Sequence, residues 1–126
     1  MNRIGDKRCA LCGCPIQEIV QGAHIWNVAD IRQSNLTDAD KFKAATNGNN
    51  GLWLCQNHHK LFDANIIMIG HDGSLRIPNT LDDNDSAYIK DITSERHLET
   101  SILSDDFLQY LDLRNVSVDL EHSVAI

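Results

Sequence analysis

The stretch Asn50-Gly-Leu-Trp-Leu-Cys-Gln-Asn-His-His59 changes character half-way along its length. Its first half is apolar, and Asn50 to Leu54 predicts a short β-strand. The second half is polar and opens a segment, Gln56 to Ala64, that we expect to form a helix. Two adjacent histidines, His58 and His59, therefore stand in the first turn of a helix that directly follows a strand.

Two pairs of metal-binding residues are spaced along the chain, Cys9-x-x-Cys12 and Cys55-x-x-His58. Clustered cysteines in a reducing compartment favour metal ligation over disulfides. Four such ligands in two pairs suit a closed tetrahedral Zn²⁺ site, and we predict a structural zinc. Cys14 is an alternative to Cys12, which we prefer because a proline follows Cys14 directly. The plain alternative is that Cys9 and Cys12 are buried free thiols.

We expect four further elements around these pairs. They are a strand from Gln17 to Trp26, a helix over about 38–46 capped by Thr37, a hairpin from Ile66 to Ile77, and a helix that opens at Ser104. Helices and strands are mixed along the chain, so the predicted fold class is α+β. The last helix carries apolar residues that, if exposed, invite a homodimer: Phe107, Leu108, Tyr110 and Leu111.

The net charge of −7 is unevenly distributed over the 126 residues. Residues 1–79 carry eight Lys and Arg against seven Asp and Glu, whereas residues 80–126 carry three against eleven. We therefore predict a motif-bearing core over 1–79 and an acidic C-terminal extension over 80–126, which packs on the core or on a second protomer. The N-terminus has no secretory pattern and no apolar run is long enough to cross a membrane, so we expect a cytoplasmic protein.

Together with Ala23-His24-Ile25, the stretch from Asn50 to His59 resembles the HNH nuclease family. The family's pattern runs Asp/Ala-His-Ile and, after a variable loop, Asn-Leu-x-x-Leu-Cys-x-x-Cys-His. This chain has one inserted glycine after Asn50, and His58 stands at the second zinc cysteine of the pattern. The trailing Lys60-Leu-Phe-Asp63 is similar to the branch of the family with His-His-x-Leu-Phe-Asp.

The resemblance covers about residues 9–77. It implies the ββα-metal fold, in which a two-stranded hairpin and a helix surround an ion. Here we expect this unit to carry a zinc knuckle and a C-terminal helical extension.

The resemblance also implies roles for individual residues. His24 would be the general base that accepts a proton from the attacking water, and His59 would bind the catalytic Mg²⁺ or another divalent cation. Asn50 would fix the imidazole of His24 by a hydrogen bond or restrain the strand. Many members have an aspartate as second metal ligand where this chain has Ala23. Asp63, at i+4 from His59, is our first candidate for that ligand, with a structural role at the helix end as the alternative.

The predicted function is metal-dependent DNA endonuclease activity, with double-stranded DNA cut to 5′-phosphate and 3′-hydroxyl ends. We expect a prokaryotic or phage setting such as restriction or defence. The alternative is a catalytically inactive, zinc-stabilised module that binds DNA or protein, for which Ala23 and the acidic charge argue. Trp26 and Trp53 are expected to pack in the core, and His71, His97 and His122 are given no role.

Overall fold

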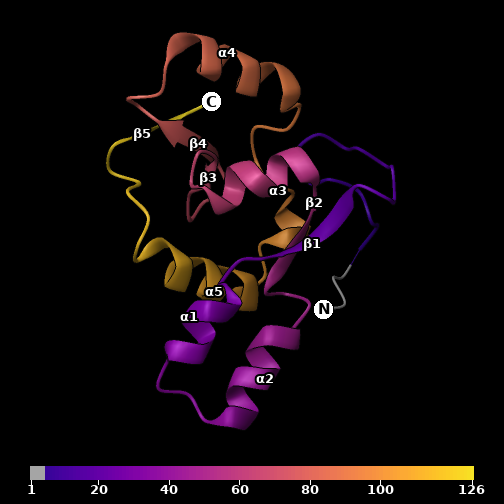
Figure 1. The fold of residues 1–126 in the computed structure, drawn as a ribbon, viewed down its shortest axis with the longest axis vertical. Helices are drawn as coiled ribbons and strands as arrows, with labels where there is room; N and C mark the ends of the chain where they lie inside the picture. The colour runs from indigo at the N-terminus through magenta and orange to yellow at the C-terminus, as the bar shows by residue number, and fades with distance from the viewer. Residues whose placement is uncertain (1–4) are drawn as a thin grey trace.

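Two strands and one helix form the centre of the computed structural model, which describes residues 5–126. Strand β1 (Val20–His24) pairs antiparallel with β2 (Gly51–Cys55), and α3 (Gln56–Asp63) follows β2 without a loop (Figure 1). The register sets His24 opposite Gly51 at one end of the ladder. This ββα unit and the mixed helices and strands confirm the predicted α+β class.

The connection from β1 to β2 is a pair of helices, α1 (Val28–Gln33) and α2 (Asp38–Thr46). The side chain of Thr37 caps α2 by accepting from the backbone N–H of Asp40 at 3.2 Å, so the helix predicted over 38–46 is confirmed. The strand predicted over 17–26 was too long, and α1 was missed. The chain turns into α1 directly after Trp26, because the side chain of Asn27 caps that helix.

A second, three-stranded sheet has the order β3 (Met68–Ile69), β4 (Leu75–Pro78), β5 (Ser123–Ala125). The predicted hairpin over 66–77 is confirmed by the antiparallel pairing of β3 with β4. Strand β5 was not predicted, and its pairing with β4 brings the end of the chain back onto the hairpin.

The C-terminal segment contains α4 (Asp83–Ile92), a short 3₁₀ helix η1 (Thr100–Ile102) and α5 (Asp105–Asn115). The helix predicted to open at Ser104 is confirmed, and the side chain of Ser104 caps α5 by accepting from the backbone N–H of Phe107. Phe107 and Leu111 are fully buried, so the expectation of an exposed apolar face on this helix is wrong. The face packs on the core of the same chain, which removes the reason given for self-association.

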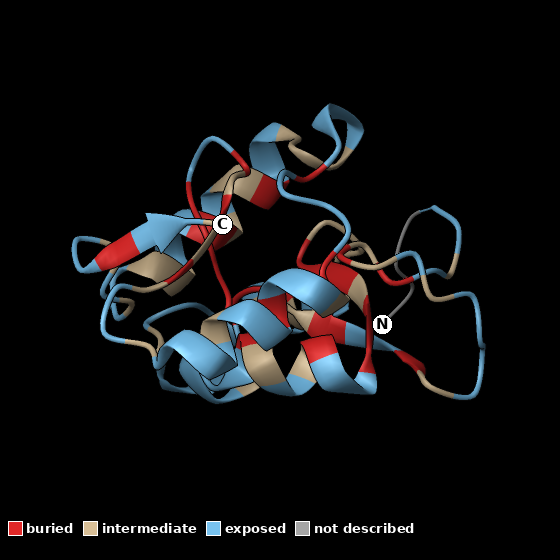
Figure 2. Ribbon diagram, turned by 90° about the horizontal axis from the view of Figure 1, so that it is seen from above, coloured by how far each residue is buried: buried red, intermediate tan, exposed pale blue. Residues whose placement is uncertain are grey.

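The main core lies between the helices and the two sheets, and Figure 2 shows the outer helical faces exposed. It joins residues from both sides of Asn79: Leu52, Leu54, Phe62, Ile69, Leu75, Ile89, Leu98, Phe107 and Leu111 are among its members. A smaller cluster contains Trp26, which stacks on Tyr110 of α5 with ring centroids 6.4 Å apart. The prediction that Trp26 packs in the core is confirmed, whereas Trp53 is only half-buried.

Over residues 5–126, no helix combines the length and apolar character that crossing a membrane requires.

Candidate active site and metal centre

The four predicted zinc ligands lie together. The sulfur atoms of Cys9, Cys12 and Cys55 and Nδ1 of His58 are all within 4.8 Å of one another. The Sγ–Nδ1 distances to His58 are 3.6 Å from Cys9 and 3.2 Å from Cys55, and the sulfurs of Cys12 and Cys55 are 3.9 Å apart. A tetrahedral zinc site has edges of about 3.8 Å between sulfurs and about 3.6 Å from sulfur to nitrogen, so the four atoms fit a zinc ion.

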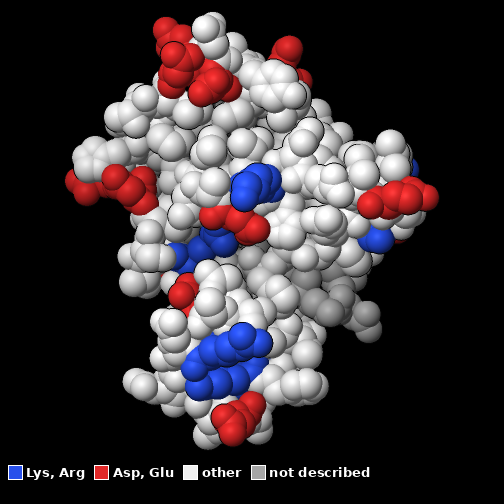
Figure 3. All heavy atoms as spheres, in the orientation of Figure 1, with Lys and Arg blue, Asp and Glu red and all other residues white. Residues whose placement is uncertain are grey.

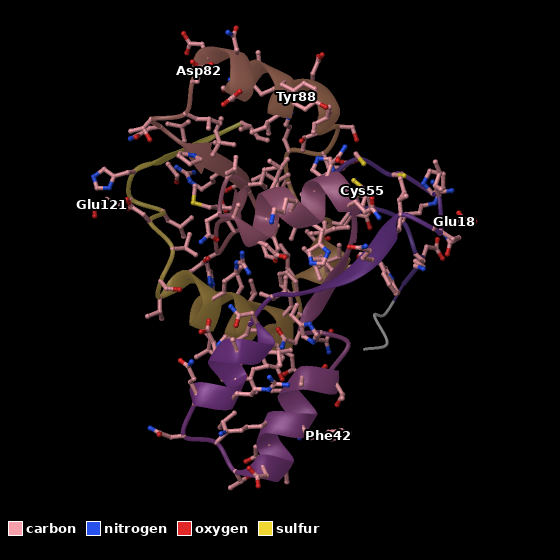
Figure 4. All side chains as sticks on the ribbon, in the orientation of Figure 1. Glu18, Phe42, Cys55, Asp82, Tyr88 and Glu121 are labelled. Carbon is pink, nitrogen blue, oxygen red and sulfur yellow. The ribbon has the colours of Figure 1, made fainter. Side chains whose placement is uncertain are left out.

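Local backbone geometry brings the two pairs together. Gly13 adopts a left-handed conformation (φ +72°) and its N–H donates to the carbonyl of Cys9 at 2.8 Å, which closes the turn of the knuckle. The N–H of Ala10 donates to the carbonyl of Trp53 at 2.8 Å and docks the turn on β2. Cys55 ends β2, as Figure 4 shows, and Cys14 is not part of the ligand set.

The C-terminal segment also contacts this possible metal site. The hydroxyl of Thr93, which is 1% exposed, lies 2.9 Å from Nε2 of His58. If that hydroxyl accepts from Nε2–H, the lone pair of Nδ1 faces the sulfurs, as a ligand requires. Burial, with smaller contributions from the thiols of Cys9 and Cys55, raises the pKa of Cys12 to about 12. A cation is therefore needed to keep Cys12 as a thiolate near neutral pH.

His24 lies at the last position of β1 and is half-buried. Its Nε2 is 2.9 Å from the carbonyl oxygen of Ala45, near the end of α2. A carbonyl oxygen can only accept, so Nε2 carries the proton and Nδ1 carries the lone pair. The structure thus holds His24 in one tautomer, with one nitrogen able to accept a proton.

Asn50 is fully buried and ties three backbone segments together. Its Oδ1 accepts from the N–H of Trp26 at 2.7 Å, and its Nδ2 donates to the carbonyls of Trp26 (3.1 Å) and Ala44 (3.0 Å). Of the two roles predicted for Asn50, these contacts match the backbone restraint. It holds the end of α2, where the carbonyl of Ala45 contacts the ring of His24.

His59 lies about 100° around the helix from its buried neighbour His58 and is partly exposed. Its Nδ1 is 2.8 Å from Oε1 of Gln21, and its Nε2 is 3.3 Å from Oδ2 of Asp63. When Nδ1–H donates to Gln21, the lone pair of Nε2 faces the Asp63 carboxylate. Neighbouring ligands at about 2.1 Å from an ion lie about 3.0 Å apart in octahedral and about 3.4 Å apart in tetrahedral geometry, so this pair fits a divalent cation.

Ala23 is fully buried against this helix and offers no ligand atom. Gln21 was not predicted as part of the site. The alternation of side chains along a strand could have indicated it. Gln21 lies two residues before Ala23, the position where many family members have a metal ligand, so both side chains lie on the same face of β1, opposite Leu54 and Leu52 of β2.

The basic side chain of Arg114 lies beside this site and was also not predicted from the sequence. Arg114, in the last turn of α5, donates to the carbonyls of Ile25 (3.1 Å) and Phe62 (2.7 Å). It therefore connects the residue after His24 with the residue before Asp63. No local sequence pattern marks it, because these two carbonyl partners are 52 and 89 positions away.

The family model for HNH endonucleases matches residues 9–70. Over these 62 of its 126 residues, the chain is similar to HNH endonucleases. The matched range contains the zinc ligands, His24, Asn50, His59 and Asp63, whereas Thr93 and Arg114 lie outside it. A comparison with curated proteins gave no match. The matched family is one of nucleases, and the Cys/His cluster of this chain is compatible with a bound metal.

Proposed function

We propose that this chain is a metal-dependent DNA endonuclease that leaves 5′-phosphate and 3′-hydroxyl ends. One observation carries the proposal. A single ββα unit holds His24 with Nδ1 free to accept a proton and, on its helix, a His59–Asp63 pair spaced for a divalent cation. The same strand, β1, carries His24 and the Gln21 that orients His59.

His24 is the proposed general base. Its Nδ1 accepts the proton that water loses as it attacks phosphorus, and the imidazole becomes cationic. The carbonyl of Ala45 stabilises that cation through the Nε2–H bond. Asn50 keeps this carbonyl in place through its bond to the neighbouring carbonyl of Ala44.

His59 and Asp63 would hold the divalent cation. When bound, that ion offsets the negative charge that builds on the phosphate and on the departing 3′ oxygen. Gln21 holds His59 in the tautomer that keeps Nε2 available for the ion. Asp63 supplies the carboxylate that Ala23 does not, and it does so from the helix and not from the strand.

The distribution of charge supports a nucleic-acid substrate despite the net charge of −7. Helices α1 and α2 carry three basic residues, Arg32, Lys41 and Lys43, against three acidic ones, Asp30, Asp38 and Asp40. Figure 3 shows basic atoms gathered in one patch over this pair of helices, with acidic atoms beside it. In the same view, acidic atoms gather at the far end, over α4. Because affinity for DNA rests on cations that meet phosphates, we place the substrate along the α1–α3 side.

A plasmid nicking assay tests the proposal. Zinc-loaded protein with Mg²⁺, Mn²⁺ or Ni²⁺ should convert supercoiled plasmid to nicked or linear forms. His24→Ala and His59→Ala should each lower the rate by about 100-fold or more. His122→Ala is the matched control, because His122 is exposed and pairs with Asp119 instead. An uncut plasmid, or a His24→Ala protein as fast as the wild type, would refute the enzyme and favour an inactive binding module.

Double-strand preference and a role in restriction or defence rest on the family resemblance alone and stay predictions.

A further inference from the structure

A polar cavity of about 260 Å³ lies beside Asp63. It is formed where the start of α1, the end of α3 and the end of α5 meet, and its walls include Asn27, Asp30 and Arg114. The cavity therefore borders the carboxylate that we assign to the divalent cation. Its cationic wall comes from the acidic C-terminal segment.

The guanidinium of Arg114 is held rigidly at this cavity. Besides the carbonyls of Ile25 and Phe62, it donates to Oδ1 of Asn65 at 3.1 Å. Its central carbon lies 3.6 Å from the centroid of the Phe62 ring, so the planar group stacks on the aromatic face. These three bonds use three of the five N–H donors that an arginine has. Two donors remain.

The charge of Arg114 has no close counter-ion. Over residues 5–126, no carboxylate oxygen lies within 4.0 Å of its guanidinium. Burial lowers the pKa of Arg114, and the more distant carboxylates of Asp63 and Asp30 act in the opposite direction. A half-buried cation whose nearest carboxylates lie beyond 4.0 Å is costly, and an anion in the cavity would offset that cost.

We propose that Arg114 binds a phosphate of the DNA backbone next to the one that is cut. This inference rests on the proposed function, because it takes the chain's substrate to be DNA. Asp30 also opposes the phosphate, because the bond that its Oδ2 accepts from Nδ2 of Asn27 at 3.1 Å is neutral and leaves the carboxylate charged. Asp63 opposes it until a cation is bound, so phosphate binding at Arg114 should strengthen with divalent cation.

The salt dependence of DNA binding tests this assignment. A labelled duplex is titrated by fluorescence anisotropy at several KCl concentrations, with His24→Ala protein so that the duplex is not consumed. Each phosphate neutralised contributes about −0.9 to the slope of log K against log salt. Adding Arg114→Gln should make the slope shallower by about 0.9 and weaken binding by about tenfold or more. Arg114→Lys should keep the slope, because the charge remains.

Arg96→Gln is the matched control, because Arg96 is exposed and its guanidinium bonds only the carbonyl of Lys90 among the contacts described. It should leave both slope and affinity unchanged. A slope for Arg114→Gln equal to that of the parent would overturn the proposal, as would a parent protein that binds no duplex.

A second pair of variants avoids the structural bonds of Arg114. Asn27→Asp keeps the acceptor of the helix cap, removes the Nδ2 donor to Asp30 and adds a negative charge to the cavity, so it should weaken duplex binding several-fold. Asn84→Asp makes the same change in charge on α4 and should have no effect. Equal binding by Asn27→Asp and Asn84→Asp contradicts the phosphate site.

The two proposals fail separately. If the plasmid stays uncut but Arg114→Gln still weakens duplex binding, the nuclease proposal fails and the phosphate site stands. A cut plasmid without that effect removes the phosphate site alone.

Discussion

The possible zinc site of Cys9, Cys12, Cys55 and His58 and the candidate catalytic site use adjacent residues of α3, but the first is closed and the second is open. His58 is buried, and its two ring nitrogens face sulfurs and the hydroxyl of Thr93. His59 is partly exposed, and its nitrogens face Gln21 and Asp63 at the surface. Neighbouring positions on a helix point about 100° apart, so one turn supplies a ligand to each site. A closed ligand set suits an ion that stabilises the fold, and an open set suits one that meets substrate.

Disrupting the closed site should have the largest effect. Cys55→Ser removes a buried ligand and should abolish stoichiometric zinc and cooperative thermal unfolding, because binding of a structural zinc contributes on the order of 10 kcal/mol. Cys14→Ser is the control and should retain one zinc per chain with little change in Tm. Metal analysis and calorimetry measure both. Full zinc content in Cys55→Ser, or loss of zinc in Cys14→Ser, would show that the ligands of the closed site are wrongly assigned.

Asn50→Ala should have the next largest effect on the free energy of unfolding. It acts where α2 meets the end of β1, away from the cysteine cluster. It leaves three buried backbone groups, of Trp26 and Ala44, without their partner. We expect a loss of about 3 kcal/mol in the free energy of unfolding, measured in urea. Zinc content should stay at one per chain. A loss under about 1 kcal/mol would show that Asn50 does not hold this region.

Thr93→Val should affect the closed site alone. The variant keeps the shape of the side chain but removes the oxygen that contacts Nε2 of His58. Zinc affinity should fall by about tenfold or more, as measured by competition with a chelator. Mn²⁺ binding at His59 should not change. An unchanged zinc affinity would mean that Thr93 plays no part in orienting His58.

Asp63→Asn should have the smallest effect and should affect the open site alone. The exposed carboxylate is lost while the side-chain volume is kept, so Tm should hardly change. The Mg²⁺ concentration for half-maximal nicking should rise by about tenfold. Asp112→Asn, at an exposed carboxylate paired with His71, serves as control. If both variants need the same Mg²⁺ as the wild type, Asp63 is not a ligand and its role lies at the helix end.

The ligands of the closed site and the order of its elements could be predicted from the sequence. Cys9, Cys12, Cys55 and His58 come together as a possible metal site, as their spacing predicted, because ligands of one ion are set three residues apart in tight turns. The ββα order was predictable because β2 runs straight into α3.

The supporting residues could not be predicted, because their partners are distant in sequence. Thr93 and Arg114 contact residues 35 to 89 positions away, and nothing local distinguishes them. Strand β5 has three residues and exists only through its pairing with β4. The sequence correctly predicted that the apolar residues of α5 share one face. It did not show that this face is buried, because the burial depends on the core formed by the rest of the chain.

We propose that one helix, α3, serves two independent metal sites. The most direct test is Mn²⁺ titration of zinc-loaded protein, followed by electron paramagnetic resonance. Wild type should bind one Mn²⁺ per chain beside one retained zinc, and His59→Ala should keep the zinc but lose the Mn²⁺. Mn²⁺ binding that is unchanged in His59→Ala, or zinc that leaves with it, would contradict the claim.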